Sequence, residues 1–258
     1  MYFVACLLVF LAAYLVNATT ISVLYHRGLA HRAVELHPRT RHLAARAGIW
    51  LTGLDAKAWV CMHRRHHAYS DTRKDPHSPT HFGLIGVLMA QYRSYERTLL
   101  GLAHGRSEYT SYVHDLDFPT SWVNRRGLWF LPYGAHLLLA AGLSLAAGGW
   151  LLGAAYFLGI MSHPIEGWVV NSLGHAVGGR NFDTPDNSRN NTAVAILMLG
   201  EGLQNNHHRY PASARFSYLA SETDPGFAIC RLLEAAGALT INREGLIPRP
   251  EGHLDEAA

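Results

Sequence analysis

Cysteine is scarce in this chain, with three residues among 258. Cys6, Cys61 and Cys230 are far apart and odd in number, which argues against a disulfide framework, and no CxxC pair is present for a metal or redox site. The 22 Lys and Arg residues barely exceed the 19 acidic residues and form no basic cluster, so nucleic-acid binding is not expected. Any metal must be held by the 17 histidines.

Charged side chains are missing from the first 25 residues, which contain no Asp, Glu, Lys or Arg. A run of this length can cross the apolar part of a bilayer as a helix. Two further candidate spans cover about residues 128–148 and 150–172, with Glu166 as their one residue of these four types. No basic segment precedes the first run, so we expect a retained span rather than a signal peptide.

Lysine and arginine are also absent between residues 127 and 179. The positive-inside rule therefore places residues 26–127 and 173–258 in the cytoplasm and the N-terminus outside. Fifteen of the 17 histidines fall in these cytoplasmic stretches, and only His136 and His163 lie in proposed spans. The sequence predicts one domain over residues 1–258, an all-α integral membrane protein with about three transmembrane helices and a helical cytoplasmic cap. Residues 42–60 are too charged to span, and we expect an interfacial helix there.

The histidines form a clear chemical pattern. His63, His66 and His67 stand at i, i+3 and i+4, so they share one helix face, as metal ligands often do. His26 and His31 are five residues apart, a spacing that an undistorted helix does not place on one face. Either these two rings flank a cavity, or the helix is loosened between them.

The number of clustered histidines predicts more than one metal ion. A single transition ion takes four to six ligands, and eight histidines are clustered. Neighbouring side chains in a helix point about 100° apart, so the two rings of an adjacent pair are expected to serve different ions. Imidazole binds iron, copper, nickel and zinc, which leaves the element open at this point. The eight candidate ligands are His26, His31, His63, His66, His67, His175, His207 and His208.

Four motifs, HRGLAH, HRRHHAYSDTRKDPH, WVVNSLGHAVG and GEGLQNNHHRYP, resemble those of the membrane-bound fatty acid desaturases, the acyl-CoA or stearoyl-CoA desaturase-like group, over about residues 21–246. The resemblance implies two irons held at the cytoplasmic face by the eight histidines, with Asn171 reaching one iron through water. The family's last box is commonly HxxHH, whereas this chain has Gln204 first, and an amide oxygen is a weaker ligand than imidazole. Either one iron is held less tightly, or Gln204 marks a bacterial-type subgroup with its own ligand set. Better-known members have four membrane segments, and we expect three in this chain, without a counterpart of the family's first.

The activity that this resemblance implies is an oxygen-dependent desaturation. Two iron ions, with O2 as co-substrate, would introduce a cis double bond of Δ9 type into a saturated acyl chain linked to CoA, a phospholipid or a carrier protein. Electrons would come from a separate ferredoxin-, rubredoxin- or cytochrome-type donor and its reductase. The active site would face the cytoplasm, at the plasma membrane of a bacterial cell, in contact with membrane lipid.

Two further sets of residues are expected around the irons. Trp59, one helical turn before His63, and Trp168 are expected to wall a tunnel for the acyl chain. Carboxylates are expected to orient the imidazoles through their second ring nitrogen, and the candidates are Asp71, Asp75, Asp183 and Glu201. Two alternatives to desaturation stay open: a hydroxylase or ketolase on the same scaffold, and a non-enzymatic membrane protein that binds or transports metal.

Overall fold

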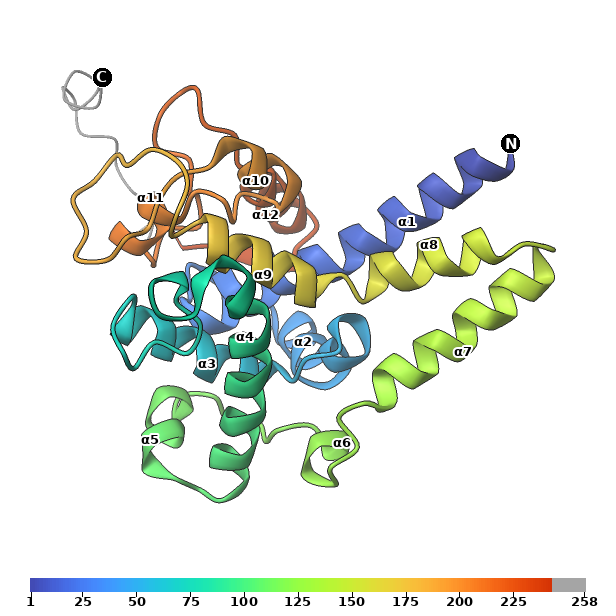
Figure 1. Cartoon of the computed structure of the whole chain (residues 1–258), viewed down its shortest axis with the longest axis horizontal. Helices are drawn as coiled ribbons and strands as arrows, with labels where there is room; N and C mark the ends of the chain where they lie inside the picture. Colours follow the sequence, from blue (N-terminus) through green and yellow to red (C-terminus); the bar gives the residue numbers. More distant parts are fainter. Residues whose placement is uncertain (243–258) are drawn as a thin grey trace.

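The computed structural model describes residues 1–242 and is mostly helical (Figure 1). Helix α1, Tyr2–Thr19, continues directly into the π-helix η1, Thr20–Ala30. Within the described residues, this continuous helix of 29 residues is the one that is long and apolar enough to cross a membrane. The rest of the chain is organised around its C-terminal end, because all eleven residues of η1 are buried.

Three apolar helices form an arm that extends away from the body of the molecule (Figure 1). Helices α7, Leu131–Ala146, and α8, Trp150–Ile160, make a hairpin, and α8 packs along α1. The turn between α7 and α8 contains Gly148 at φ 65°, a left-handed conformation that favours glycine. Large apolar side chains on the arm are exposed, among them Phe3, Leu7, Leu8 and Leu11 on α1, Leu137, Leu138 and Leu145 on α7, and Leu158 on α8.

Two segments that were predicted as single helices are broken. Residues 150–172 form α8 and then α9, His163–Leu173, because Pro164 in the first turn of α9 has no amide to continue the preceding helix. Residues 42–60 are divided between α2, Pro38–Thr52, and α3, Ala56–Tyr69. Gly53 ends α2 at φ 75°, and the Asp55 side chain caps α3 by accepting from the Ala58 amide at 3.0 Å.

The body contains α2, α3 and α9 together with further helical elements, of which α4 is the longest. These are α4 (Pro79–Ala103), α5 (Ser107–Thr110), η2 (Ser111–Val113), α6 (Trp122–Arg125), α10 (Thr192–Leu197), α11 (Gln204–Arg209) and α12 (Pro225–Ala235). A small sheet, which the sequence did not predict, pairs β1, Val34–Leu36, with β2, Leu239–Ile241, in antiparallel register. This pairing ties the segment after η1 to the C-terminal part of the described chain.

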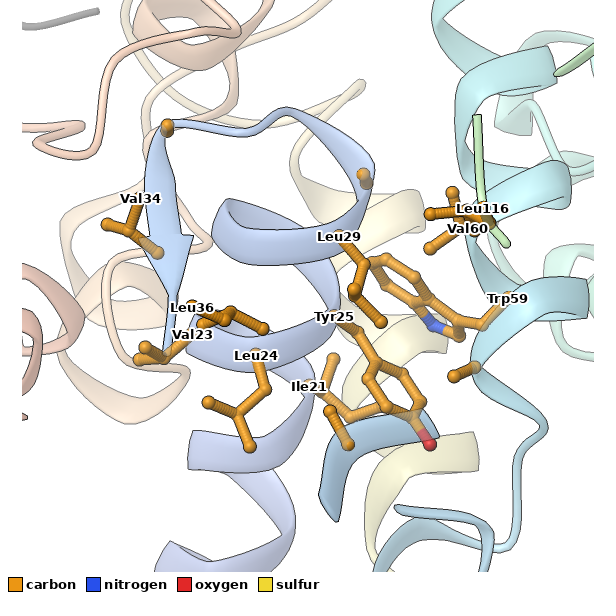
Figure 2. Packing of buried hydrophobic residues seen from close by; sticks show 14 of the residues in the cluster. Ile21, Val23, Leu24, Tyr25, Leu29, Val34, Leu36, Trp59, Val60 and Leu116 are labelled. Carbon is orange, nitrogen blue, oxygen red and sulfur yellow. The ribbon is translucent and has the colours of Figure 1, made fainter. Parts of the chain in front are cut away.

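The main hydrophobic core lies between η1 and α3 (Figure 2). Tyr25 of η1 and Trp59 of α3 meet with ring centroids 6.0 Å apart, and the Tyr25 hydroxyl donates to the Leu54 carbonyl at 3.0 Å. Gly48 of α2 allows this approach, because a Cβ at that position would lie 2.1 Å from the Tyr25 oxygen. The core therefore fixes η1 against α3, and these two elements carry four of the eight clustered histidines, with a fifth, His31, directly after η1.

Candidate metal centre and apolar cavity

The π-helix brings His26 and His31 together. The His31 amide donates to the His26 carbonyl at 3.1 Å, an i to i+5 hydrogen bond that places residues five apart on the same side. Their rings lie 5.0 Å apart. Of the two alternatives for His26 and His31, the structure shows the loosened helix and not two rings on opposite sides of a cavity.

Five imidazoles converge at the end of η1. This five-histidine group consists of His26, His31, His63, His67 and His207, with one ring nitrogen of each within 4.8 Å of the others. The Nε2 atoms of His31 and His63 are 2.7 Å apart, and the Nε2 of His207 lies 2.9 Å from those of His26 and His67. Two nitrogens at right angles around one ion, each bound at about 2.1 Å, would lie about 3 Å apart, so these spacings fit a shared cation.

Three other imidazoles form a second group. This three-histidine group consists of His66, His175 and His208. Their Nε2 atoms are buried and have no hydrogen-bond partner in the described part of the chain. Adjacent histidines are divided between the groups: His67 and His207 belong to the first, and His66 and His208 to the second.

Each imidazole of the three-histidine group faces a carboxylate through Nδ1. The distances are 3.0 Å from His66 to Asp75, 2.9 Å from His175 to Asp71 and 2.7 Å from His208 to Asp186. A carboxylate can only accept here, so Nδ1 carries the hydrogen and the Nε2 lone pair is free to bind a metal. Three such buried Nε2 atoms without a partner among residues 1–242 fit the ligand set of a transition metal cation.

Burial and hydrogen bonding set the protonation of these groups. Burial lowers the pKa of His63, His67 and His207, which keeps the rings neutral and able to bind a cation. Burial alone would raise the pKa of Asp71, but the hydrogen bonds from His175 and Ser78 lower it to about 2. The carboxylates are therefore ionised at neutral pH.

One predicted carboxylate was wrong, and another was missed. Asp183 points into solvent, and its one ion pair among residues 1–242 is with Arg180 at 3.9 Å. Asp186, three residues further on, occupies the expected place beside His208. The sequence reasoning could not separate two aspartates of one polar loop, because the loop's path decides which of them faces the histidines.

The two asparagines of the QNNHH box hold that loop in place. Asn205 accepts from the backbone amides of Asn181 and Phe182, each at 2.8 Å, and it is fully buried. Asn206, also fully buried, donates to Glu222 at 2.8 Å and accepts from the Asn181 side chain at 2.9 Å. These bonds are the structural reason for paired asparagines before His207.

Glu201 supports the five-histidine group. Its carboxylate lies 2.7 Å from His26 Nδ1 and also 3.2 Å from the Arg27 guanidinium. Arg27 is completely buried and makes a second ion pair with Asp224 at 2.9 Å. Asp71, Asp75 and Glu201 thus lie where the sequence predicted, whereas the role of Arg27 gave no signal in the motif.

A cavity of about 340 Å³ adjoins both groups. His26, His63, His66 and Glu201 line one part of it, and the remaining wall is largely apolar and aromatic, including Ile21, Trp59, Met62, Leu88, Met89, Tyr92, Trp129, Tyr133, Val170 and Met198. Trp59 stacks on the His63 ring at 4.9 Å, and its indole N–H donates to His163 Nε2 at 3.2 Å.

Of the other residues predicted around the metal, two line the cavity and one does not. Trp168 is not among the residues that line the cavity, and its indole donates to the Leu84 carbonyl at 2.7 Å. Asn171 and Gln204 both line the cavity. The Gln204 amide nitrogen donates to the Glu201 carbonyl at 2.7 Å. His77, which the sequence did not single out, is buried beside His66, with ring centroids 4.7 Å apart.

The fold and site define a helical protein in which two histidine groups that could hold metal ions lie beside an apolar cavity. Residues 2–224 match the family model of the fatty acid desaturases, and the chain belongs to this family of oxidoreductases. This membership sets aside the non-enzymatic alternative.

Individual relatives agree with the family. The chain is 32% identical over 249 residues to a probable chloroplastic lipid desaturase of Arabidopsis thaliana, a match that covers 87% of this chain and 60% of the relative. It is 31% identical over 233 residues to the Delta-9 acyl-lipid desaturase 1 of the same plant, covering 89% and 72%. A hex-5-enoyl-[acyl-carrier protein] acetylenase of Moorena producens (strain JHB) is 31% identical over 227 residues, covering 84% and 70%.

Proposed function

We propose that this chain is an oxygen-dependent di-iron acyl desaturase that acts at a membrane surface. The observation that carries the proposal is the apolar cavity whose wall includes His26 and His63 of one histidine group and His66 of the other. A saturated chain in this cavity would present a methylene to both metal positions at once. The proposed iron ligands are the eight clustered histidines.

Two irons would supply the oxidising power that side chains lack. The balanced reaction takes one saturated acyl chain, O2, two electrons and two protons, and gives one acyl chain with a cis double bond and two waters. The chain's own residues bind and orient. Carboxylates accept hydrogen bonds from Nδ1 of four histidines and so orient these rings. The apolar cavity excludes bulk water from the reacting carbons.

Trp59 is the residue that we propose to shape the acyl cavity at the metal centre. Its ring is fixed on one side by stacking on His63 and at its edge by the hydrogen bond to His163. Asn171 and Gln204 complete the polar part of the wall, where a water bridge from either amide to the three-histidine group would supply the ligands that this group lacks.

The apolar arm is proposed to insert into the bilayer. Its exposed leucines and phenylalanine face outward, where lipid would cover them. The 16 residues of α7 extend about 24 Å, which is less than the roughly 30 Å of a bilayer's hydrocarbon core. The bilayer would therefore have to become thinner around the α7–α8 hairpin for the hairpin to cross it beside α1. The positive-inside rule then places both histidine groups in the cytoplasm, with three spans and the N-terminus outside.

The substrate details are proposals by similarity. Relatives named Delta-9 acyl-lipid desaturases support attack between carbons nine and ten, while the acyl carrier, whether CoA, phospholipid or carrier protein, stays open. An external ferredoxin-, rubredoxin- or cytochrome-type carrier with its reductase would deliver the two electrons.

Expression of the full chain in a bacterial host with a ferredoxin and its reductase tests the activity. Gas chromatography with mass spectrometry of the host lipids should show a new cis-monounsaturated acid, and purified protein should contain about two irons per chain. His63→Ala should abolish both, whereas His42→Ala, an exposed histidine outside both groups, should change neither. A hydroxylated or keto acid without olefin would replace desaturation by oxygen insertion.

A further inference from the structure

The two histidine groups differ in the charge that surrounds them. Every imidazole of the three-histidine group has a carboxylate within 3.0 Å of Nδ1. In the five-histidine group, Glu201 beside His26 is the one carboxylate found within 4.0 Å of a ring nitrogen among residues 1–242. The three-histidine group therefore has three carboxylates next to its three imidazoles, and the five-histidine group has one carboxylate next to its five.

The three aspartates are held by neutral donors. Asp75 accepts from the backbone amides of Asp71 and His77, at 2.7 and 2.9 Å. Asp71 accepts from the Ser78 hydroxyl and the Asn187 amide, and Asp186 accepts from the amide and hydroxyl of Ser188. The nearby Arg180 binds the backbone carbonyl of Asp186 rather than its carboxylate, at 2.7 Å. The negative charge of this group is therefore not offset by a paired cation.

Glu201, by contrast, is paired with a permanent cation. Arg27 stays protonated in proteins, is 0% exposed, and lies 3.2 Å from the Glu201 carboxylate. Its guanidinium also sits 3.7 Å above the Phe216 ring, whose centroid is 4.6 Å from that of His207. Arg27 also pairs with Asp224 at 2.9 Å, so its charge is shared between two carboxylates, and Glu201 is partly compensated where the three aspartates are not.

These charges act on a bound metal in a predictable direction. A carboxylate on the far ring nitrogen makes an imidazole a stronger donor, and anionic charge in a poorly hydrated interior favours the more highly charged state of an ion. We infer that the two metal positions are electronically unequal, because three aspartates without a paired cation stand behind one and a single glutamate paired with Arg27 stands behind the other. Arg27 is a positioning residue that contributes to this difference. An ion held by the three-histidine group would have the lower reduction potential and would be oxidised first. This inference rests on the proposed two-iron site.

Stepwise oxidation of protein loaded with iron-57 tests it. Mössbauer spectra at controlled potentials should show two ferrous signals that convert to ferric at different potentials. His175→Ala should remove the signal of the three-histidine group and so assign it. Asp186→Asn should bring the two potentials together, because it removes one anion from that group, and Glu201→Gln should move them further apart.

Two variants test Arg27 itself: Arg27→Lys keeps the positive charge, and Arg27→Gln removes it. Arg27→Lys should keep the two potentials apart, and Arg27→Gln should narrow the difference because Glu201 and Asp224 then lose the cation that they share. Because Arg27→Gln could prevent folding, the Asp186 and Glu201 variants decide the matter independently. Fewer than two irons per chain would overturn the proposed function, whereas two irons that oxidise at one potential in the unaltered protein would overturn this inference alone.

Discussion

His26 and His31 lie on one side of the helix because the chain between them is a π-helix, with the His31 amide bonded to the His26 carbonyl at 3.1 Å. A regular α-helix would separate the two rings by about 140° around the axis. Both imidazoles can therefore join the five-histidine group only while the wider turn persists. Its stability rests on packing, since every residue of η1 is buried.

Gly28 is a direct test of this turn. A Cβ at Gly28 would lie 2.9 Å from the Leu36 side chain, so Gly28→Val should push η1 away from β1, lower the free energy of unfolding by about 1–3 kcal/mol and reduce bound iron. The matched control is Gly134→Val in α7, where nothing lies within 4 Å of the added Cβ. Thermal unfolding in detergent and metal analysis measure both effects. Unchanged iron content in Gly28→Val would show that the turn tolerates the shift.

Asp186 and Asp183 provide a second matched pair. Asp186→Asn leaves a side chain of the same shape but weakens the orientation of His208, so we expect iron affinity or activity to fall by about 10- to 100-fold. Asp183→Asn changes an exposed carboxylate and should have no effect. Iron binding measured with a competing chelator distinguishes the two variants, and equal losses would contradict the assignment of Asp186.

The sequence predicted the members of the histidine cluster better than the path of the chain between them. Spacing on one helix face placed His63 and His67 together because an α-helix has a fixed period. It left a loosened helix at His26 as one of two alternatives, since the choice depends on burial against α2 and α3, and it did not predict the break before His163, which separates α8 from α9. Asp186 was missed for a related reason, because the buried asparagines of α11 position its loop.

The two tryptophans test the cavity. Trp59→Phe removes the hydrogen bond to His163, so the aromatic side chain beside His63 is held less firmly. We expect a mixture of double-bond positions and almost unchanged iron content. His163→Leu should give the same mixture, because it removes the other partner. Trp168→Phe also removes an indole hydrogen bond, but one outside the cavity, so its product should keep a single double-bond position. Mass spectrometry of derivatised products locates the double bond, and a single unchanged position in all three variants would rule out this role for Trp59.

Asp115 predicts a stability change at acid pH. Burial alone would raise its pKa, but Arg64 and Arg32 lower it to about 2, below the value of about 3.9 for an unfolded chain. A lowered carboxylate pKa stabilises the fold above about pH 4, and this stabilisation is lost as the pH falls toward 2. Asp115→Asn should thus destabilise the protein by about 1 kcal/mol at pH 7 and by less as the pH approaches 2. Urea unfolding across this range measures the convergence, and a constant difference would contradict it.

The eight clustered histidines come from four separate places in the chain: η1 and the residue after it, α3, the turn after α9, and α11. Metal bound to them would join these places as crosslinks do, and ligands that bind only the folded state add their binding energy to folding. Iron supply would then govern how long each molecule survives proteolysis, as well as whether it can react. A cell short of iron should lose this protein itself, and its membrane lipids should become more saturated as a result.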